Sequence, residues 1–262
     1  MLSNNQIKHI RSLSRKKNRI LHQEFIIEGE KIVTELINQN QDDSSIKWKI
    51  KKIFAYQEWL NKFQNNTNIK QYDIQVLNEG ELDKISSLVT PNQVLALINI
   101  NDLEINFPEI NMSLSLYLDD IQDPGNLGNI IRISDWFGIK NLFCSENSVD
   151  SYNPKVIQAT MGSFCRVNVY NVNIRSIISN VENKFPVYGT FLEGENIYST
   201  DLNSRGLIIF GNESKGINQE LIKFIKQKLY IPAFPSITKE TDSLNVSSAA
   251  AIICSEFRRR II

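Results

Sequence analysis

The sequence predicts an α/β protein with two domains, because two successive series of short apolar runs alternate with helical segments. The chain has 262 residues, 42% of them hydrophobic, which is enough for the cores of one large or two ordinary domains. Between the two series, residues 101–111 show weak periodicity and contain Pro108, as expected of a linker. We therefore predict a small α/β domain at residues 1–104 and a larger domain built on a parallel sheet at residues 112–262.

The smaller domain is predicted from a basic helical stretch at its start and from the short apolar runs that follow it. The predicted helices span residues 4–22, 30–38 and 79–87. The predicted strands span residues 25–27, 50–55, 74–77 and 94–100. Because helices and strands alternate here, a small α/β unit is the most economical interpretation.

The larger domain is predicted from a regular alternation of apolar strands and helices, the pattern typical of a parallel sheet covered on both faces. The predicted strands span residues 113–118, 141–144, 164–170, 187–192, 207–210 and 229–231. The predicted helices span residues 127–137, 154–161, 174–183, 219–227 and 245–260.

Composition excludes several classes of protein. No apolar run approaches the roughly 20 residues that span a bilayer, and the polar, basic start lacks the apolar core of a signal peptide, so we expect a cytoplasmic protein. Cys144, Cys165 and Cys254 are far apart in apolar surroundings, which favours reduced, buried thiols over disulfides or a metal site. Because the only histidines are His9 and His22, chemistry in the larger domain must proceed without imidazole.

Basic residues gather near both ends of a chain whose formal net charge is zero. Net neutrality argues against a purely electrostatic nucleic-acid binder. The basic residues near the start are Lys8, Arg11, Arg15, Lys16, Lys17 and Arg19, with no acidic residue before Glu24. Three arginines, residues 258–260, stand near the other end. Such patches can neutralise phosphates or form the solvated face of a helix, and the pattern alone leaves both interpretations open.

The first strand of the larger domain leads into a turn-rich loop and a helix. Asn126 stands at the predicted start of this helix, where its side chain can cap the first free amides. Arg132 and Trp136 lie away from the face that is expected to pack on the sheet, so they point outwards. The sheet-facing residues are Leu127, Ile130, Ile131, Ser134 and Phe137. The outward face indicates a partner surface or the edge of a site, although an ion pair between Arg132 and Asp135 would also explain the arginine.

Two more polar segments stand near the carboxyl ends of predicted strands. Residues 211–216, Gly-Asn-Glu-Ser-Lys-Gly, directly follow a buried strand, the position where ligands bind in open α/β sheets. The lysine precedes the second glycine and no hydroxyl follows, so this is not a Walker phosphate loop. Residues 243–246, Ser-Leu-Asn-Val, lead into a helix that Asn245 or Ser243 can cap. Alanines at 249–251 make that helix thin enough to pack closely on the same chain or on a second subunit.

Together, the three segments resemble the three sequence motifs of the SpoU branch of the SPOUT methyltransferases. Asn126-Leu127-Gly128 with Arg132 is similar to the first motif, and residues 211–216 with Glu213 are similar to the second. Ile231-Pro232 with Ser243-Leu244-Asn245-Val246 is similar to the third. Each pattern alone is common, whereas all three in this order are specific. The stretch between the two parts of the third motif is longer than in comparable members, around residues 238–241.

The resemblance implies an enzyme that transfers a methyl group from S-adenosylmethionine to a ribose 2′-hydroxyl of RNA, without a metal ion. It also implies a deep trefoil knot in the carboxyl-terminal part of the sheet. Family members are homodimers in which the arginine of the first motif, here Arg132, reaches the cofactor site of the other subunit. The residues implied in catalysis are Asn126, Arg132, Glu213, Ser243 and Asn245. The residues implied in cofactor binding are Thr190, Gly211, Asn212, Gly216, Ile231 and Leu244.

The start of the chain resembles an RNA-binding extension found in part of this family, through residues 15–19 and through Phe25-Ile26-Ile27-Glu28-Gly29. Because of this resemblance, we predict that the basic patch near the start of the chain contacts RNA. The resemblance also favours ribosomal RNA over transfer RNA as the substrate. The predicted RNA-binding residues are Arg11, Arg15, Lys16, Lys17 and Arg19. Three alternatives stay open: a transfer RNA 2′-O-methyltransferase, a non-catalytic RNA-binding or assembly protein of the same fold, and a base methyltransferase of a related knotted branch.

Overall fold

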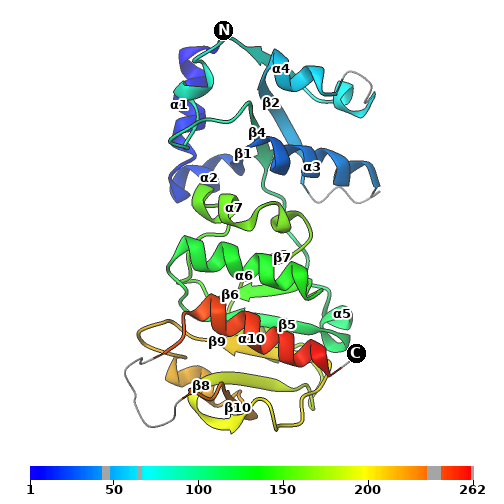
Figure 1. The fold of residues 1–262 in the computed structure, drawn as a ribbon, viewed down its shortest axis with the longest axis vertical. Coiled ribbons are helices and arrows are strands. Elements are labelled where there is room, and N and C mark those ends of the chain that lie inside the picture. Colours follow the sequence, from blue (N-terminus) through cyan, green and yellow to red (C-terminus); the bar gives the residue numbers. More distant parts are fainter. Residues whose placement is uncertain (43–47, 64–66, 235–242, 261–262) are drawn as a thin grey trace. The chain divides into compact units, whose positions relative to one another are not determined.

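The computed structural model describes residues 1–42, 48–63, 67–234 and 243–260, and it divides the chain into two compact units (Figure 1). The first unit comprises Met1–Asp102 and Asp150–Cys165, and the second comprises Leu103–Val149 and Arg166–Ile262. A segment from the second half of the sequence therefore belongs to the first unit by its contacts. Within the described ranges, no helix combines the length and the hydropathy that a membrane span requires.

The first unit is built on a mixed four-stranded sheet with the strand order β1-β4-β2-β3. Its strands are β1 (Glu24–Glu28), β2 (Ile50–Tyr56), β3 (Ile74–Leu77) and β4 (Val94–Asn99). β4 pairs antiparallel with β1 and with β2, whereas β2 and β3 are parallel. Its α-helices are α1 (Asn4–Ser12), α2 (Lys16–His22), α3 (Glu30–Asp42), α4 (Gln57–Asn61) and α7 (Pro154–Thr160). Its 3-10 turns are η1 (Thr67–Gln71), η2 (Leu82–Lys84) and η3 (Ser163–Cys165).

Two predicted helices of the first unit differ from the structure. The predicted helix 4–22 is two helices, because the chain breaks after Leu13 and the Asn18 side chain donates to the carbonyl of Ser12 over 2.9 Å. The predicted helix 79–87 is wrong apart from the short turn η2. Here the carboxylate of Glu81 accepts hydrogen bonds from the backbone amides of Leu2 (2.6 Å) and Asn78 (2.8 Å), which offers the backbone an alternative to helical pairing.

Neighbouring residues of β1 pack on opposite faces of the first sheet, as the alternation of a strand requires. Phe25 belongs to the core that contains residues of α3 and α7, where its ring lies 4.9 Å from that of Tyr152 and 6.2 Å from that of Phe164. Ile26 belongs to the core that contains Ile10 of α1. The segment Asp150–Cys165 is thus part of the hydrophobic core of the first unit.

Arg19 is part of this packing, and its predicted role as an RNA-binding residue does not fit its position. The residue is only 2% exposed. Its Nε and Nη2 atoms donate to Oδ2 of Asp150 over 2.8 and 2.5 Å, and its Nη1 atom donates to the carbonyl of Leu13 over 2.7 Å. The guanidinium therefore joins α2 to the segment that begins at Asp150. Sequence spacing could not reveal a partner 131 positions away.

The second unit is built on a six-stranded sheet with the order β10-β8-β9-β5-β6-β7, and every pair of neighbours is parallel. This confirms the predicted α/β fold with a parallel sheet. Its strands are β5 (Leu114–Leu118), β6 (Asn141–Cys144), β7 (Asn168–Asn171), β8 (Val187–Asn196), β9 (Gly206–Phe210) and β10 (Gln227–Tyr230). Its helices are α5 (Phe107–Met112), α6 (Pro124–Trp136), α8 (Ile174–Ile178), α9 (Gln219–Ile222) and α10 (Val246–Arg259).

Helices cover both faces of the second sheet. Residues of α5, α8 and α9 share one core with inward side chains such as Tyr117 and Ile209. α6 and α10 lie side by side (Figure 1), and the ring of Phe257 on α10 packs edge-on against that of Tyr188 on β8. The predicted sheet-facing residues of α6 are buried, except that Phe137 is half-buried at the end of the helix.

Several boundaries of the second unit differ from the prediction. The predicted linker 101–111 contains α5, and its apolar residues Leu103 and Ile105 pack on the core of this unit. The predicted strand 164–170 begins only at Asn168, because residues 163–165 form the turn η3. The predicted helix 219–227 ends at Ile222, since the amide of Lys226 already donates to Val187 of β8 over 2.9 Å.

The arginines at 258–260 are engaged within the second unit. Arg258 donates to the carbonyls of Phe137 (2.7 Å) and Gly138 (3.1 Å), and so binds the carboxyl end of α6. Arg259 and Arg260 donate to the buried carboxylate of Glu256 over 2.8 to 2.9 Å. The Arg259 guanidinium, with Arg260, lowers the pKa of Glu256 to about 2. These contacts give the arginines at 258–260 a structural role that does not require them to bind a phosphate.

Replacing Arg19 by alanine is expected to lower the free energy of unfolding of the first unit by about 3 to 5 kcal/mol, because it leaves the half-buried Asp150 carboxylate without its partner. Arg15→Ala is the matched control, since Arg15 is exposed, and should change stability by less than about 0.5 kcal/mol. Denaturant unfolding followed by the fluorescence of the buried Trp48 and Trp59 measures both. Equal effects of the two substitutions would contradict the account.

Candidate functional site at the carboxyl edge of the parallel sheet

Three polar residues from distant parts of the sequence meet at the carboxyl edge of the second sheet. The side-chain amide of Asn126, in the first turn of α6, donates to Oε1 of Glu213 over 2.6 Å. Oδ1 of the same amide accepts a hydrogen bond from Nδ2 of Asn245 over 3.0 Å. Glu213 lies in the loop after β9, and Asn245 precedes α10. Asn126 therefore joins the three segments that the sequence singled out.

Asn126 can make these bonds because it does not cap its own helix, contrary to the sequence-based expectation. The cap is Asp123, whose carboxylate accepts from the amide of Asn126 over 2.7 Å, with Pro124 at the first helical position. The helix thus begins earlier than predicted, and Asn126 already lies within its first turn. Its side chain is left to bind the other two segments.

Asn245 caps α10 and binds Asn126 at the same time. Its Oδ1 accepts from the amide of Ser247 over 2.9 Å and from the Ser247 hydroxyl over 2.7 Å. That hydroxyl in turn accepts from Nδ2 of Asn129 over 3.0 Å, which ties α10 to α6 a second time. Of the two possible caps, Asn245 is the one used; Ser243 is exposed and its side chain makes no hydrogen bond with a residue in the described ranges.

The loop 211–216 folds back closely on the end of β9. A Cβ atom on Gly211 would lie 2.3 Å from the carbonyl carbon of Gly216 and 2.3 Å from the amide nitrogen of Ile217, so only glycine fits. Asn212 and Gly216 exchange two backbone hydrogen bonds of 3.1 and 2.9 Å, and Gly216 has a φ of +69°. The Asn212 side chain accepts from the amides of Ser214 and Lys215 and closes the turn from inside.

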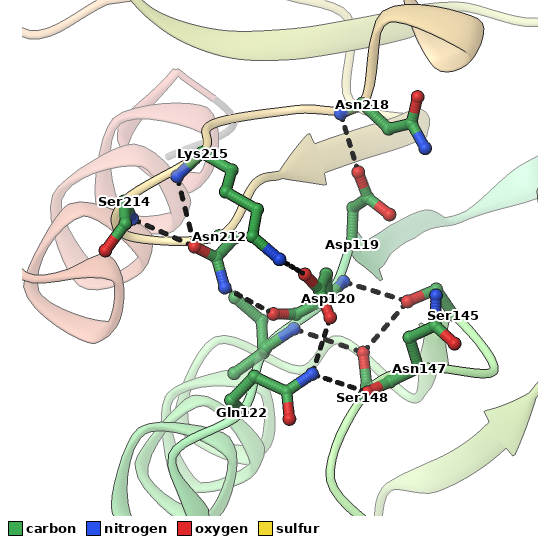
Figure 2. A network of polar contacts seen from close by, with 11 residues as sticks. Asp119, Asp120, Gln122, Ser145, Asn147, Ser148, Asn212, Ser214, Lys215 and Asn218 are labelled. Atoms are coloured by element: carbon green, nitrogen blue, oxygen red, sulfur yellow. Dashed lines mark hydrogen bonds and ion pairs between the residues drawn. The ribbon is translucent and has the colours of Figure 1, made fainter.

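Two acidic residues that follow β5, Asp119 and Asp120, hold this loop against its neighbours (Figure 2). The buried carboxylate of Asp119 accepts from the amide of Asn218 over 2.8 Å, and burial raises its pKa, although this hydrogen bond acts in the opposite direction. The Asp120 carbonyl accepts from Nδ2 of Asn212 over 2.8 Å. The Asp120 carboxylate pairs with Nζ of Lys215 at 3.1 Å. Neither residue was predicted to belong to the site, although paired acids after a buried strand could have indicated them.

Arg132 is exposed on α6 and makes no hydrogen bond or ion pair with any residue in the part of the chain that the structure describes. The alternative of an ion pair with Asp135 does not hold, because the Asp135 carboxylate is bound by Arg166 over 2.6 to 3.0 Å. One turn beyond Arg132, Trp136 is 84% exposed. A free guanidinium and a large apolar ring therefore share the outward surface of this helix.

The residues predicted to bind the cofactor stand at the same edge of the sheet. Gly189, which precedes Thr190, pairs with Ile209 near the end of β9, and Ile231 directly follows β10. Leu244, adjacent to the helix cap Asn245, is 50% exposed. The predicted longer stretch around 238–241 lies outside the described residues. No group of three metal-ligating side chains is found among the residues that the structure describes.

The predicted RNA-binding residues belong to the first unit. Arg11 lies on α1, Arg15 precedes α2, and Lys16 and Lys17 form its first turn; all four are exposed. Arg19, on the same helix, is buried and paired as described above. The structure thus leaves four of the five residues available to a partner.

Known proteins resemble this chain over nearly its whole length. It matches the SpoU rRNA Methylase family over residues 113–255 and the MRM3-like substrate binding domain over residues 4–96. The 23S rRNA (guanosine(2553)-2′-O)-methyltransferase RlmP of Bacillus subtilis (strain 168) is 28% identical over 260 residues, which cover 97% of this chain and 96% of the relative.

Solved structures also share the fold over nearly the whole chain. A protein assigned to the TrmH family of RNA methyltransferases from Porphyromonas gingivalis superimposes with a TM-score of 0.86 and 33% identity, covering 99% of both chains. An AdoMet-bound rRNA methyltransferase from Sinorhizobium meliloti superimposes with a TM-score of 0.84 and 25% identity, covering 100% of this chain and 97% of that chain.

The close approach at Gly211 is open to a direct test. Gly211→Ala is expected to lower the free energy of unfolding by about 1 to 3 kcal/mol, because the new Cβ overlaps the backbone of the loop. Gly216→Asn is the control: no atom lies near a Cβ at that position, and asparagine tolerates its left-handed backbone. Thermal or denaturant unfolding measures both variants. A loss for Gly211→Ala no greater than for Gly216→Asn would show that the loop does not pack as closely as described.

Proposed function

Because the chain belongs to the SpoU rRNA Methylase family, we propose that it transfers a methyl group from S-adenosylmethionine to a ribose 2′-hydroxyl of ribosomal RNA. The observation that carries this proposal is the convergence of Asn126, Glu213 and Asn245 at one edge of the sheet. The name of the Bacillus subtilis relative supports ribosomal RNA as the substrate. The AdoMet-bound state of the Sinorhizobium meliloti neighbour supports the cofactor.

The residues at this edge fit S-adenosylmethionine. Gly211 has no side chain at the point where the loop turns back. Three apolar side chains in the neighbouring segments are exposed: Leu192 within β8, Phe234 after β10 and Leu244 before α10. An adenine ring can bury against such side chains while free backbone groups bind its polar edge. We assign cofactor binding to Thr190, Gly211, Asn212, Gly216, Ile231 and Leu244.

A deep trefoil knot at this edge is part of the proposal. β10 lies at one end of the strand order, yet Asn245 binds Asn126, which follows β5 on the far side of β9. Ile231, which follows β10, and Asn245, which precedes α10, therefore lie on opposite sides of the loop after β9. A knot at this edge would surround the cofactor with backbone groups.

The chemistry requires a positioned hydroxyl and a destination for its proton. S-adenosylmethionine supplies an electrophilic methyl group on a sulfonium. A guanidinium stays protonated in proteins and does not act as a base, so Arg132 binds an RNA phosphate and stabilises the developing alkoxide instead. A phosphate oxygen or a water molecule takes the proton. Asn126, Glu213, Ser243 and Asn245 shape the site.

A homodimer would bring Arg132 to the site of the partner subunit. Three features support this part of the proposal: the absence of a partner for Arg132 among the described residues, the exposure of Trp136, and the alanines on α10, which packs beside α6. An exposed large ring beside a thin helix is the kind of surface that a second subunit covers. Each site would then contain residues from both chains.

The first unit would bind the RNA. Its match to the MRM3-like substrate binding domain supports this role, as do the exposed cations Arg11, Arg15, Lys16 and Lys17. Cations that lie along exposed helices neutralise backbone phosphates irrespective of sequence. Choice of nucleotide would then depend on how the two units together hold the RNA.

The reaction is tested by transfer of labelled methyl from S-adenosylmethionine to total RNA from a strain that lacks this gene, followed by nucleoside analysis. Label in a 2′-O-methylnucleoside of ribosomal RNA is the expected result. The same nucleoside in transfer RNA would change the substrate, and label on a base would indicate a base methyltransferase. No transfer to any fraction, ribosomal subunits included, would favour a non-catalytic RNA-binding protein.

Arg132→Lys is expected to lower turnover roughly 100-fold, because an ammonium cannot reproduce the forked contacts of a guanidinium with a phosphate and an alkoxide. Arg175→Lys is the control, since Arg175 is an exposed arginine that pairs with Glu220 on the second unit. Single-turnover methyl transfer and RNA affinity are measured together. Near-normal turnover of Arg132→Lys with normal RNA affinity would exclude a specific role for the guanidinium.

The double substitution Lys16→Ala and Lys17→Ala is expected to weaken RNA binding and to flatten its salt dependence. In a plot of log affinity against log salt concentration, each lost lysine–phosphate contact reduces the magnitude of the slope by about 0.7 to 0.9. Lys184→Ala with Lys223→Ala is a control of equal charge, because both lysines are exposed on the second unit. Affinities measured over a series of salt concentrations compare the two proteins, and the proposal for the first unit is wrong if their slopes coincide.

A further inference from the structure

Asp120 occupies an unusual backbone position between the second sheet and its loops. Its φ is +57°, in the left-handed region that few residues other than glycine adopt, although aspartate and asparagine tolerate it best among them. The residue before it, Asp119, still continues the sheet, since its amide donates to the carbonyl of Phe210 over 2.8 Å. The chain therefore turns sharply at Asp120, immediately beyond the last ladder hydrogen bond.

The turn directs the polar groups of Asp120 to three different loops (Figure 2). Its amide donates to the hydroxyl of Ser145, after β6, over 2.8 Å. Its carbonyl accepts from Nδ2 of Asn212, after β9, over 2.8 Å. Its carboxylate accepts from Gln122 within its own loop and from Lys215, whose ammonium lies 3.1 Å away. One residue thus connects the loops that follow β5, β6 and β9.

The bond to Asn212 links this turn to the site. The Asn212 amide uses its nitrogen on the Asp120 carbonyl and its oxygen on the amides of Ser214 and Lys215. Glu213 lies between these residues and holds the side chain of Asn126. The direction of the Asp120 carbonyl therefore sets where the loop 211–216 and the Glu213 carboxylate lie.

We propose that Asp120 is a positioning residue for cofactor binding, and that it acts through its left-handed backbone rather than through its charge. This inference rests on the proposed use of S-adenosylmethionine and adds a residue that acts at a distance from the reacting atoms. The Lys215 ion pair is secondary, because the lysine side chain is 77% exposed and such pairs contribute little in water.

Three substitutions separate the backbone from the charge. Asp120→Asn removes the charge but keeps a side chain that tolerates the left-handed region, Asp120→Gly keeps the backbone freedom without a side chain, and Asp120→Val disfavours the conformation. Isothermal titration of the full chain with S-adenosylmethionine measures the dissociation constant of each. We expect a rise below about threefold for Asn and for Gly, which both adopt the left-handed region, and about tenfold or more for Val.

Ser148→Ala is the matched control for loss of stability. The Ser148 hydroxyl accepts from the amide of Ile121 and donates to the carbonyl of Leu118, so it belongs to the same network but does not touch the loop 211–216. Thermal unfolding compares the stability of this variant with that of Asp120→Val. For the same loss in melting temperature, Asp120→Val should weaken cofactor binding more than Ser148→Ala does, and an equal weakening would overturn the proposal.

Amide hydrogen exchange of the ligand-free protein gives a readout that is independent of cofactor binding. Asp120→Val should accelerate exchange at Asn212 and Gly216, whose amides donate to each other's carbonyls, and Asp120→Asn should not. Unchanged exchange and affinity in Asp120→Val, or an Asn variant as impaired as the Val variant, would overturn the role of the backbone. If the wild type did not bind S-adenosylmethionine, the proposed function would fail, and unchanged exchange in Asp120→Val would separately show that Asp120 does not hold the loop.

Discussion

The side-chain amide of Asn126 joins three parts of the site through two hydrogen bonds of opposite sense. It donates to Glu213, 87 positions away, and accepts from Asn245, 119 positions away. A primary amide is well suited to this position, because a carboxylate could not donate to Glu213 and an apolar side chain could make neither bond. The loop after β9 and the start of α10 are both oriented by this contact. The proposed cofactor and RNA contacts at this edge all depend on that orientation.

The parallel sheet makes the contact possible. β5 lies next to β9, so the loops that follow these strands emerge side by side at one edge, as in other open α/β sheets. α6 and α10 pack together on the same unit, and Ser247 and Asn129 join them close to the helix starts. Gly211 lets the loop after β9 turn back within this limited space, and the left-handed turn at Asp120 fixes the direction from which that loop is held. The strand order therefore brings the loops of the site together, and the hydrogen bonds of its polar side chains fix how those loops are arranged.

Local patterns in the sequence predicted the strands, the parallel sheet and the three polar segments, because apolar runs and glycine positions reflect short-range constraints. Long-range partners were not predictable in this way. Arg19 resembles its basic neighbours in sequence, but its role follows from Asp150, which the fold brings to α2. Asn126 was expected to cap a helix, whereas Asp123 three positions earlier does so. Asp120 carried no signal beyond its pairing with Asp119 after a buried strand, since its importance lies in a backbone angle that the sequence does not specify.

The most direct test of this account is photochemical labelling of the full chain with radioactive S-adenosylmethionine, followed by mapping of the labelled peptides. Label is expected in peptides that contain residues 211–218 or 243–246, and that label should be lost in Gly211→Ala. Label confined to peptides of the first unit, or label that survives in Gly211→Ala at the level of the wild type, would contradict the assignment of the cofactor to the carboxyl edge of the parallel sheet.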